Sequence, residues 1–221
     1  MRQSVPWFVR AGKALESAPG PTPWYSALLV RITGGELRSR SLTAPRGKAT
    51  RPTSDRVREA LFSMLHARDD DPYGPAVLDL YAGTGALALE ALSRGAPRAV
   101  LVENARPALE AIRANVRALD VEARVEVIAG RVEQVTTRLR GPYGVIFCDP
   151  PYADVPAPRT REALEALALT LVEGGTLVLE HAPSDAPPLL SAVDRVTTRV
   201  YGDTALTFFS RPLGGAAHDG G

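Results

Sequence analysis

The chain has 221 residues, which is enough for one or two domains. Its 45% hydrophobic and 23% charged residues are typical of a globular protein, and its net charge of +1 gives no overall sign of a nucleic-acid partner. A single cysteine excludes an intrachain disulfide framework, and with only three histidines beside it we expect no metal site. No apolar stretch approaches the ~20 residues of a membrane span, and the N-terminus lacks the apolar core of a secretory signal, so we predict a cytoplasmic protein.

The N-terminal part divides by composition into an extension and a predicted hairpin. Residues 1–27 contain four prolines and no sustained hydrophobic periodicity, which predicts an irregular extension. Residues 28–52 are predicted to form a β-hairpin followed by a basic loop, with strands over 28–32 and 36–42 around the turn Thr33-Gly34-Gly35. Arg38 and Arg40 would then share one face of the second strand, because they are two residues apart.

Basic residues are concentrated between Val30 and Ala60. This window holds eight arginine and lysine residues against three acids, a net charge of +5, which is typical of a surface that binds a polyanion. An ordinary solvated charged face is the alternative, and we favour RNA binding. The residues predicted to hold RNA phosphates are Arg31, Arg38, Arg40, Arg51 and Arg56.

The rest of the chain alternates helices and strands, and we assign residues 53–213 to one catalytic domain. We expect Thr53 to cap a helix that runs to about Ala67. Further helices are predicted over 86–92, 107–119, 132–139 and 159–171, and strands over 76–80, 99–103, 123–128, 143–148, 175–180, 191–201 and 205–210. This alternation predicts a doubly wound α/β fold with a mostly parallel sheet, and a closing hairpin at Gly202-Asp203 makes its last strand antiparallel. Residues 214–221 are predicted to be a disordered tail.

A glycine-rich turn follows the first strand of this domain. The glycines of Tyr81-Ala82-Gly83-Thr84-Gly85 allow a tight bend and a close approach of the backbone to a ligand. Glu103 ends the next strand, twenty residues after Gly83, where its carboxylate can accept both ribose hydroxyls of a nucleoside. The pattern also fits a relaxed nicotinamide-dinucleotide fingerprint. Asp79 favours S-adenosylmethionine instead, because its carboxylate suits a ligand ammonium and would repel a pyrophosphate.

The segment Asp149-Pro150-Pro151-Tyr152 follows the apolar strand 143–148 and carries the candidate acceptor chemistry. Two prolines fix the backbone and offer no N–H groups, so neighbouring carbonyls are free to accept. A carboxylate before them and an aromatic ring after them suit a planar base that carries an NH2 group. An ordinary turn at a strand end is the alternative for an isolated tetrapeptide of this kind. We expect Cys148 to be a small buried apolar residue.

From about Val30 to Arg211 the chain resembles the RsmD family, the 16S ribosomal RNA (guanine(966)-N(2))-methyltransferases. The resemblance is strongest in Arg31-Ile32-Thr33-Gly34-Gly35 and in the stretch from Arg51 to Phe62, and it includes the glycine loop. It implies a class I S-adenosylmethionine-dependent methyltransferase fold, Rossmann-like with seven strands and a small N-terminal β-hairpin. It also implies that the substrate is 16S rRNA, in the small ribosomal subunit or its assembly intermediate, and that no metal is needed.

Two departures from the family pattern affect these expectations. The extension before Leu28 is longer than the family usually carries, and Gly130-Arg131 stands where related enzymes often have an acidic or amide residue near the adenine. We therefore expect backbone groups near Val132 to recognise the adenine. The predicted cofactor-binding residues are Asp79, Tyr81, Gly83, Thr84, Gly85, Glu103, Asn104, Arg131, Val132 and Asp149.

The predicted reaction needs neither a metal nor a covalent intermediate. Asp149 and the carbonyl of Pro150 would accept the two N–H hydrogens of the guanine N2 amine and aim its lone pair at the methyl group, with Pro151 keeping the turn rigid and Tyr152 stacking on the base. The target base must leave its stack to reach such a site.

Three alternatives remain open at this point. An adenine-N6 DNA methyltransferase uses the same tetrapeptide, but usually with a larger target-recognition domain. A glutamine-N5 protein methyltransferase usually has Asn at the position of Asp149. The third is a nucleic-acid-binding or ribosome-assembly module that keeps the fold without turnover.

Overall fold

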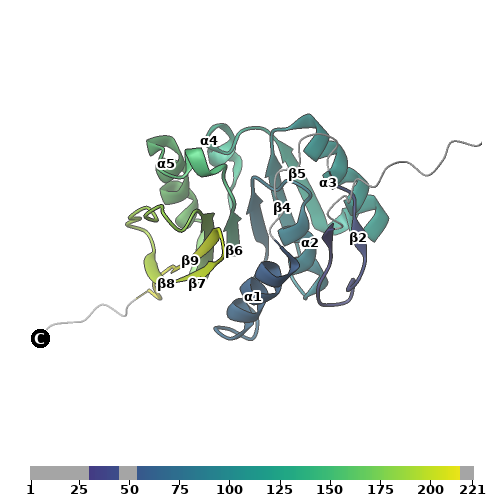
Figure 1. The fold of residues 1–221 in the computed structure, drawn as a ribbon, viewed down its shortest axis with the longest axis horizontal. Helices are drawn as coiled ribbons and strands as arrows, with labels where there is room; N and C mark the ends of the chain where they lie inside the picture. The colour runs from purple at the N-terminus through teal and green to yellow at the C-terminus, as the bar shows by residue number, and fades with distance from the viewer. Residues whose placement is uncertain (1–29, 45–53, 215–221) are drawn as a thin grey trace, which may run out of the picture.

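A twisted sheet of seven strands forms the centre of the fold in the computed structural model, which describes residues 30–44 and 54–214 (Figure 1). Five strands run parallel in the order β5-β4-β3-β6-β7. They are β3 (Val77–Leu80), β4 (Ala99–Glu103), β5 (Val125–Ala129), β6 (Tyr143–Cys148) and β7 (Leu171–His181). β3 and β6 are buried along their whole length, as expected for strands covered on both faces.

The sheet is completed by an antiparallel pair, β8 (Asp194–Tyr201) and β9 (Thr204–Ser210). The last strand, β9, lies between β7 and β8 and runs antiparallel to both. Gly202 has a φ of 61° in the turn that joins β8 to β9. The mostly parallel seven-stranded sheet with an antiparallel last strand is therefore confirmed.

Helices cover both faces of the sheet. The helices α1 (Asp55–His66), α2 (Ala86–Ser93) and α3 (Arg106–Leu119) belong to one apolar core. The helices α4 (Val132–Val135) and α5 (Pro158–Ala168) belong to the core on the other face. The apolar stripe of α3, with Ile112 and Val116 buried, shows why its 3.6-residue periodicity predicted a helix there.

Several predicted boundaries shift by a few residues. The first helix is capped by Ser54, whose Oγ accepts from Val57 N at 3.3 Å, whereas Thr53 lies outside the described residues. The helix expected to run to Leu139 stops at Val135 and continues as the short 3₁₀ segment η2 (Thr136–Arg138). Another 3₁₀ turn, η1 (Glu122–Arg124), precedes β5.

The end of α5 was predicted three residues too late. The helix stops at Ala168, and Leu171 already belongs to β7, where it pairs with Tyr143. Leu171 is buried, and an apolar residue is as suited to the buried face of a last helical turn as to the start of a buried strand. Its apolar character therefore did not distinguish the two. β7 also continues one residue beyond the predicted end, to His181.

The N-terminal hairpin is present but much shorter than predicted. Its strands are β1 (Val30–Arg31) and β2 (Ser41–Leu42), paired antiparallel as Val30↔Leu42 and Arg31↔Ser41. Residues 36–39 form turns instead of a strand, and Ser39 has a φ of 69°. The prediction that Arg38 and Arg40 share a strand face was wrong, because this segment turns: Arg38 N donates to the Gly35 carbonyl at 3.2 Å and Arg40 N to the Leu37 carbonyl at 3.1 Å.

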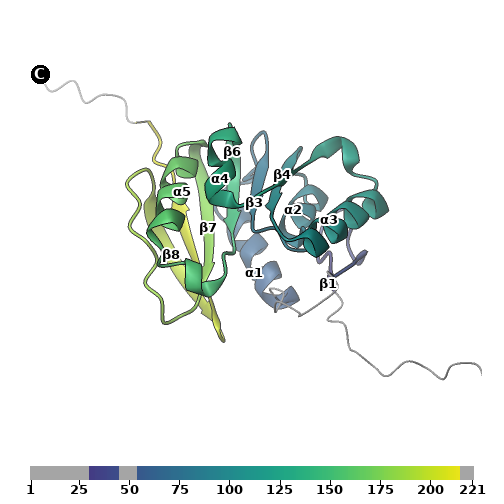
Figure 2. The same ribbon diagram turned by 90° about the horizontal axis from the view of Figure 1, so that it is seen from above.

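Both views place this hairpin beside α2 and α3, at the end of the molecule away from β8 (Figures 1 and 2). The predicted extension 1–27, the basic residue Arg51 and the tail 215–221 lie outside the described residues. Within the described ranges, no helix is both long and apolar enough to cross a membrane.

Candidate cofactor and acceptor site

The order of the strands brings the predicted site residues to one edge of the sheet. From β3 the chain builds outward through β4 and β5 on one side, and then through β6 and β7 on the other. Open α/β sheets bind ligands at the carboxyl ends of the strands on either side of such a reversal. The glycine loop follows β3, Glu103 ends β4 and Asp149 follows β6, so the three predicted elements meet there as expected.

The glycine loop has a left-handed backbone at alternate positions. Tyr81, Gly83 and Gly85 have φ values of 59°, 56° and 78°. Gly85 is also the N-cap of α2, and a Cβ there would lie 3.0 Å from Leu101 Cδ2. A side chain at this position would be strained and crowded, which explains why the loop ends on glycine.

Glu103 fastens this loop to the end of β4. Its Oε2 accepts from Gly83 N at 2.9 Å, and its Oε1 accepts from Asn104 N at 2.7 Å and from Ala105 N at 2.8 Å. A carboxylate has about four acceptor positions, so these bonds leave capacity for a ligand hydroxyl. Glu103 therefore has a structural role that sequence reasoning missed, in addition to the ribose contact predicted for it.

Asp79 is buried beneath the loop, with 2% of its surface exposed. Its Oδ2 accepts from Ala88 N at 3.1 Å. Burial raises the pKa of this carboxyl to about 8; the bond from Ala88 opposes the shift and the Glu103 carboxylate adds to it. A cationic group close to Asp79 would restore its charged form, which is the environment predicted for a ligand ammonium.

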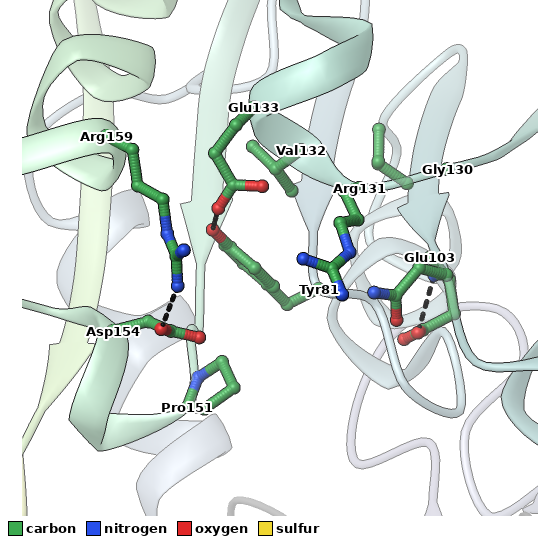
Figure 3. A pocket seen from close by; sticks show the side chains of 11 residues that line it. Tyr81, Glu103, Gly130, Arg131, Val132, Glu133, Pro151, Asp154 and Arg159 are labelled. Carbon is green, nitrogen blue, oxygen red and sulfur yellow. Dashed lines mark hydrogen bonds and ion pairs between the residues drawn. The ribbon is translucent and has the colours of Figure 1, made fainter. Parts of the chain in front are cut away.

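A cavity of about 260 Å³ opens between the end of β4 and the start of α4 (Figure 3). It is lined by six residues predicted to bind cofactor or acceptor: Tyr81, Glu103, Asn104, Arg131, Val132 and Pro151. Gly130 lines it as well, which places the Gly130-Arg131 departure at the cavity. The residues Glu103, Arg131 and Val132 come from two adjacent strand ends, as the doubly wound pattern predicts.

Three charged residues of this cavity were not predicted. Tyr81 donates its hydroxyl proton to Glu133 Oε1 at 3.1 Å, and Arg159 pairs with Asp154 at 2.7 Å (Figure 3). Glu133 supplies an acid three residues after Gly130, although the departure from the family pattern at Gly130-Arg131 led us to expect only backbone groups there. Glu133 could have been predicted as a cavity residue, because it directly follows Val132 at the start of α4. No sequence pattern pointed to Asp154 or Arg159.

Asp149 follows β6 and is only partly exposed. Burial raises its pKa well above the usual range, and the carboxylates of Glu180 and Asp79 add to the shift. Cys148 beside it is buried, as predicted. After Pro151 the backbone turns into η3 (Tyr152–Asp154), and the Pro151 carbonyl accepts from Asp154 N at 2.7 Å. The side chain of Tyr152 lies outside what the structure describes, so its stacking role stays a prediction.

The predicted RNA-binding arginines differ in how free their side chains are. Arg31 is exposed and donates Nε to Asp55 at 2.9 Å, and Arg40 is exposed and donates to the Ala118 carbonyl at 2.5 Å. Arg38 and Arg56 are also exposed. Arg58, counted in the +5 window, is only 1% exposed and bonds to Asp55 and the Arg31 carbonyl. Arg58 is therefore not available to RNA phosphates, although it was counted among the eight basic residues of the window.

No group of three or more His, Cys, Asp and Glu side chains within 30–44 and 54–214 is arranged to hold a metal ion.

Comparison with known proteins places this site in a family. The model described as "Conserved hypothetical protein 95" matches residues 30–210. A Bacillus subtilis (strain 168) protein named "Putative rRNA methyltransferase YlbH" is 31% identical over 197 residues, covering 82% of this chain and 99% of that protein. "Ribosomal RNA small subunit methyltransferase D" of Escherichia coli (strain K12) is 37% identical over 123 residues, covering 56% of this chain and 60% of that protein.

Solved structures agree with the fold. A hypothetical protein of Thermus thermophilus superposes with a TM-score of 0.70 at 36% identity, covering 81% of this chain and 98% of that one. More distant neighbours include an RNA methyltransferase candidate from Pyrococcus horikoshii, with a TM-score of 0.57 at 18% identity over 78% of this chain and 94% of that one. The fold is therefore that of the class I S-adenosylmethionine-dependent methyltransferases, as the resemblance implied.

Proposed function

Because the chain belongs to the family described as Conserved hypothetical protein 95, the RsmD family, we propose that it transfers a methyl group from S-adenosylmethionine to the exocyclic N2 amine of a guanine in 16S ribosomal RNA. The observation that carries the proposal is the meeting of the glycine loop, Glu103 and the Asp149-Pro150-Pro151-Tyr152 segment at one sheet edge. A dinucleotide-binding protein would need the first two features, but it has no use for the third.

The residues around the cavity fit the proposed cofactor. Glu103, already held by three backbone N–H groups, is rigid enough to bind ribose hydroxyls with little further loss of freedom. Asp79, which is buried beneath the glycine loop and does not line the cavity, would pair with the ammonium of the methionine part and ionise when it does so. Val132 and Gly130 line the cavity and would offer apolar surface and backbone to the adenine, and Glu133, which also lines it, would accept from the adenine amino group.

The acceptor site would work mainly by positioning. When bound, the sulfonium of S-adenosylmethionine supplies an already activated methyl group. Asp149 and the Pro150 carbonyl would accept the two hydrogens of the guanine amine, so that the nitrogen lone pair points toward that methyl group. In its ionised form, Asp149 would take up the amine proton as the new N–C bond forms. Tyr152 would hold the plane of the base.

The RNA would lie along the hairpin and the start of α1. Arg31, Arg38, Arg40 and Arg56 offer their guanidinium groups there, while the net charge of the whole chain is only +1. Such contacts with phosphates position a nucleic acid without reading its sequence. The relatives named for ribosomal RNA support 16S rRNA as the partner, presented in the small ribosomal subunit or an assembly intermediate that holds the target base unstacked.

The test offers the protein three substrates with labelled S-adenosylmethionine: naked 16S rRNA, small ribosomal subunits that lack the modification, and duplex DNA. We expect label on a guanine N2 in a ribosomal substrate, identified by nuclease digestion and mass spectrometry. Methylation of adenine in DNA, with none on ribosomal guanine, would replace the proposal with the adenine-N6 alternative. Cofactor binding without transfer to any substrate would favour a non-catalytic module.

A further inference from the structure

A buried amide joins the cofactor loop to the hairpin. Asn115, on α3, has 1% of its surface exposed. Its Oδ1 accepts from Thr43 N at 2.7 Å, and its Nδ2 donates to the carbonyls of Thr43 at 3.1 Å and Thr84 at 2.9 Å. Both N–H hydrogens of the amide and its oxygen are thus bonded to backbone.

The two segments held by Asn115 are far apart in sequence and differ in proposed role. Thr84 lies between the two glycines of the cofactor loop, whereas Thr43 directly follows β2 of the hairpin. A buried side chain that bonds the backbone of both segments fixes their positions relative to each other. Loss of any one of these bonds leaves a buried polar group unpaired, which is more costly than the bond itself.

The hairpin has further anchors, and two of them are side chains of α2. Ser93 Oγ accepts from Leu37 N at 2.8 Å and donates to the Gly34 carbonyl at 2.6 Å. Glu90, fully buried, accepts from Thr33 N at 2.7 Å and from Gly34 N at 2.8 Å. Ser93 therefore holds the hairpin through bonds of the same kind as those of Asn115, but these bonds do not reach the glycine loop.

We propose that Asn115 is a positioning residue that couples binding of the cofactor to binding of the RNA. The inference rests on the proposed function, in which the glycine loop meets the cofactor and the hairpin arginines meet RNA. A ligand packed against residues 83–85 would restrict the Thr84 carbonyl, and through the Asn115 amide it would restrict Thr43 and the hairpin. Coupling between two binding sites is reciprocal, so bound RNA raises cofactor affinity by the same factor.

The experiment measures the affinity of the full chain for small ribosomal subunits with and without saturating S-adenosylhomocysteine, the reaction product. The quantity compared is the ratio of the affinity for the subunit with S-adenosylhomocysteine to the affinity without it. In the unmodified protein we expect this ratio to be at least ~5, the lower end of typical coupling. In Asn115→Ala this ratio should fall close to one. In the control Ser93→Ala, affinity for the subunit should fall while the ratio is kept, because the link to Thr84 is intact.

A second variant covers the case in which Asn115→Ala does not fold. Asn115→Asp keeps an acceptor for Thr43 N and loses both N–H donors, so its affinity ratio should also fall close to one. An unchanged ratio in the folded Asn115 variant, or an equal loss of the ratio in Ser93→Ala, would overturn the coupling role. Failure of the unmodified protein to bind either ligand would overturn the proposed function itself, which separates the two results.

Discussion

Glu103 and Asp79 are the two carboxylates proposed to bind the cofactor, and their environments differ. Glu103 is held by three N–H donors, whereas Asp79 is buried and its pKa is raised to about 8. Glu103 was expected from its position at the end of β4, and Asp79 from its position four residues before Gly83. Their different environments come from the fold, because Glu103 accepts from three backbone N–H groups whereas Asp79 is buried and accepts from one, that of Ala88.

Replacing Glu103 with Ala should weaken S-adenosylmethionine binding by about 1–3 kcal/mol, the range for removing a charge-assisted hydrogen bond. Affinity for RNA, measured without cofactor, should barely change, since the arginine-rich hairpin keeps its own anchors. Isothermal titration calorimetry measures the effect, with Glu110→Ala as the control because Glu110 is exposed and pairs with Arg106 on α3. Equal cofactor affinity in the two variants would move the ribose contact to another residue.

Replacing Asp149 with Ala should remove most methyl transfer and leave cofactor and RNA binding largely intact. The reason is that its proposed contact strengthens as the amine becomes tetrahedral, in the transition state. Single-turnover assays with labelled cofactor measure the rate, and Asp70→Ala, on an exposed loop, serves as the matched control. A wild-type rate in the Asp149 variant would refute the proposed chemistry.

Tyr152 allows a separate test of the stacking role. Tyr152→Phe keeps an aromatic ring and should keep most of the activity, whereas Tyr152→Ala should lose about 1–3 kcal/mol of base binding. The same single-turnover assay, run over a range of substrate concentrations, separates a loss of binding from a loss of rate. If both variants lose activity equally, the hydroxyl rather than the ring is needed.

Among the elements, the hairpin changed most between expectation and structure. Its strands have two residues each, and its position depends on bonds to α2 and α3 rather than on its own pairing. Arg40 also donates to the last turn of α3, so its removal would disturb that helix end in addition to any RNA contact. Arg38 is the cleaner position at which to test RNA binding.

Replacing Arg38 and Arg40 with Ala should weaken RNA binding and reduce its salt dependence. Removing one arginine–phosphate interaction with single-stranded RNA makes the slope of log K against log salt shallower by about 0.7. The measurement is a binding titration at several salt concentrations, with Arg38→Ala alone as the variant that leaves the α3 interaction in place. The matched control is Arg195→Ala with Arg199→Ala, on the edge strand β8 at the far side of the sheet. An equal change of slope in the control pair would mean that RNA does not prefer the hairpin.

Across the whole molecule, buried acids make stability depend on pH. The pKa values of Asp79 and Asp149 are raised in the folded protein, so the folded state holds protons that the unfolded chain releases. Their contribution is complete below the unfolded pKa of about 4 and is lost as pH rises through the folded values, which for Asp79 is about 8.

The ligand-free protein should therefore lose unfolding free energy between about pH 4 and pH 8 at Asp79, and Asp149 should add a loss of the same sign as the pH rises. Asp79→Asn cannot ionise and should show a flatter profile, with the share of Asp149 remaining. Urea unfolding at a series of pH values gives both curves. Parallel curves for the two proteins would mean that Asp79 ionises normally in the fold.

The sequence by itself determined the alternation of helices and strands, the antiparallel end of the sheet, and the strand ends that carry the glycine loop, Glu103 and Asp149. These features are local, since hydrophobic periodicity, glycine and proline act on the few residues around them. Only the tertiary structure decided that Arg58 is buried, that residues 36–39 form turns, that Glu133 and Arg159 reach the cavity, and that Asn115 holds Thr43 and Thr84. Each of these depends on a partner from another element, and the residues bonded to Asn115 lie 72 and 31 positions away along the chain.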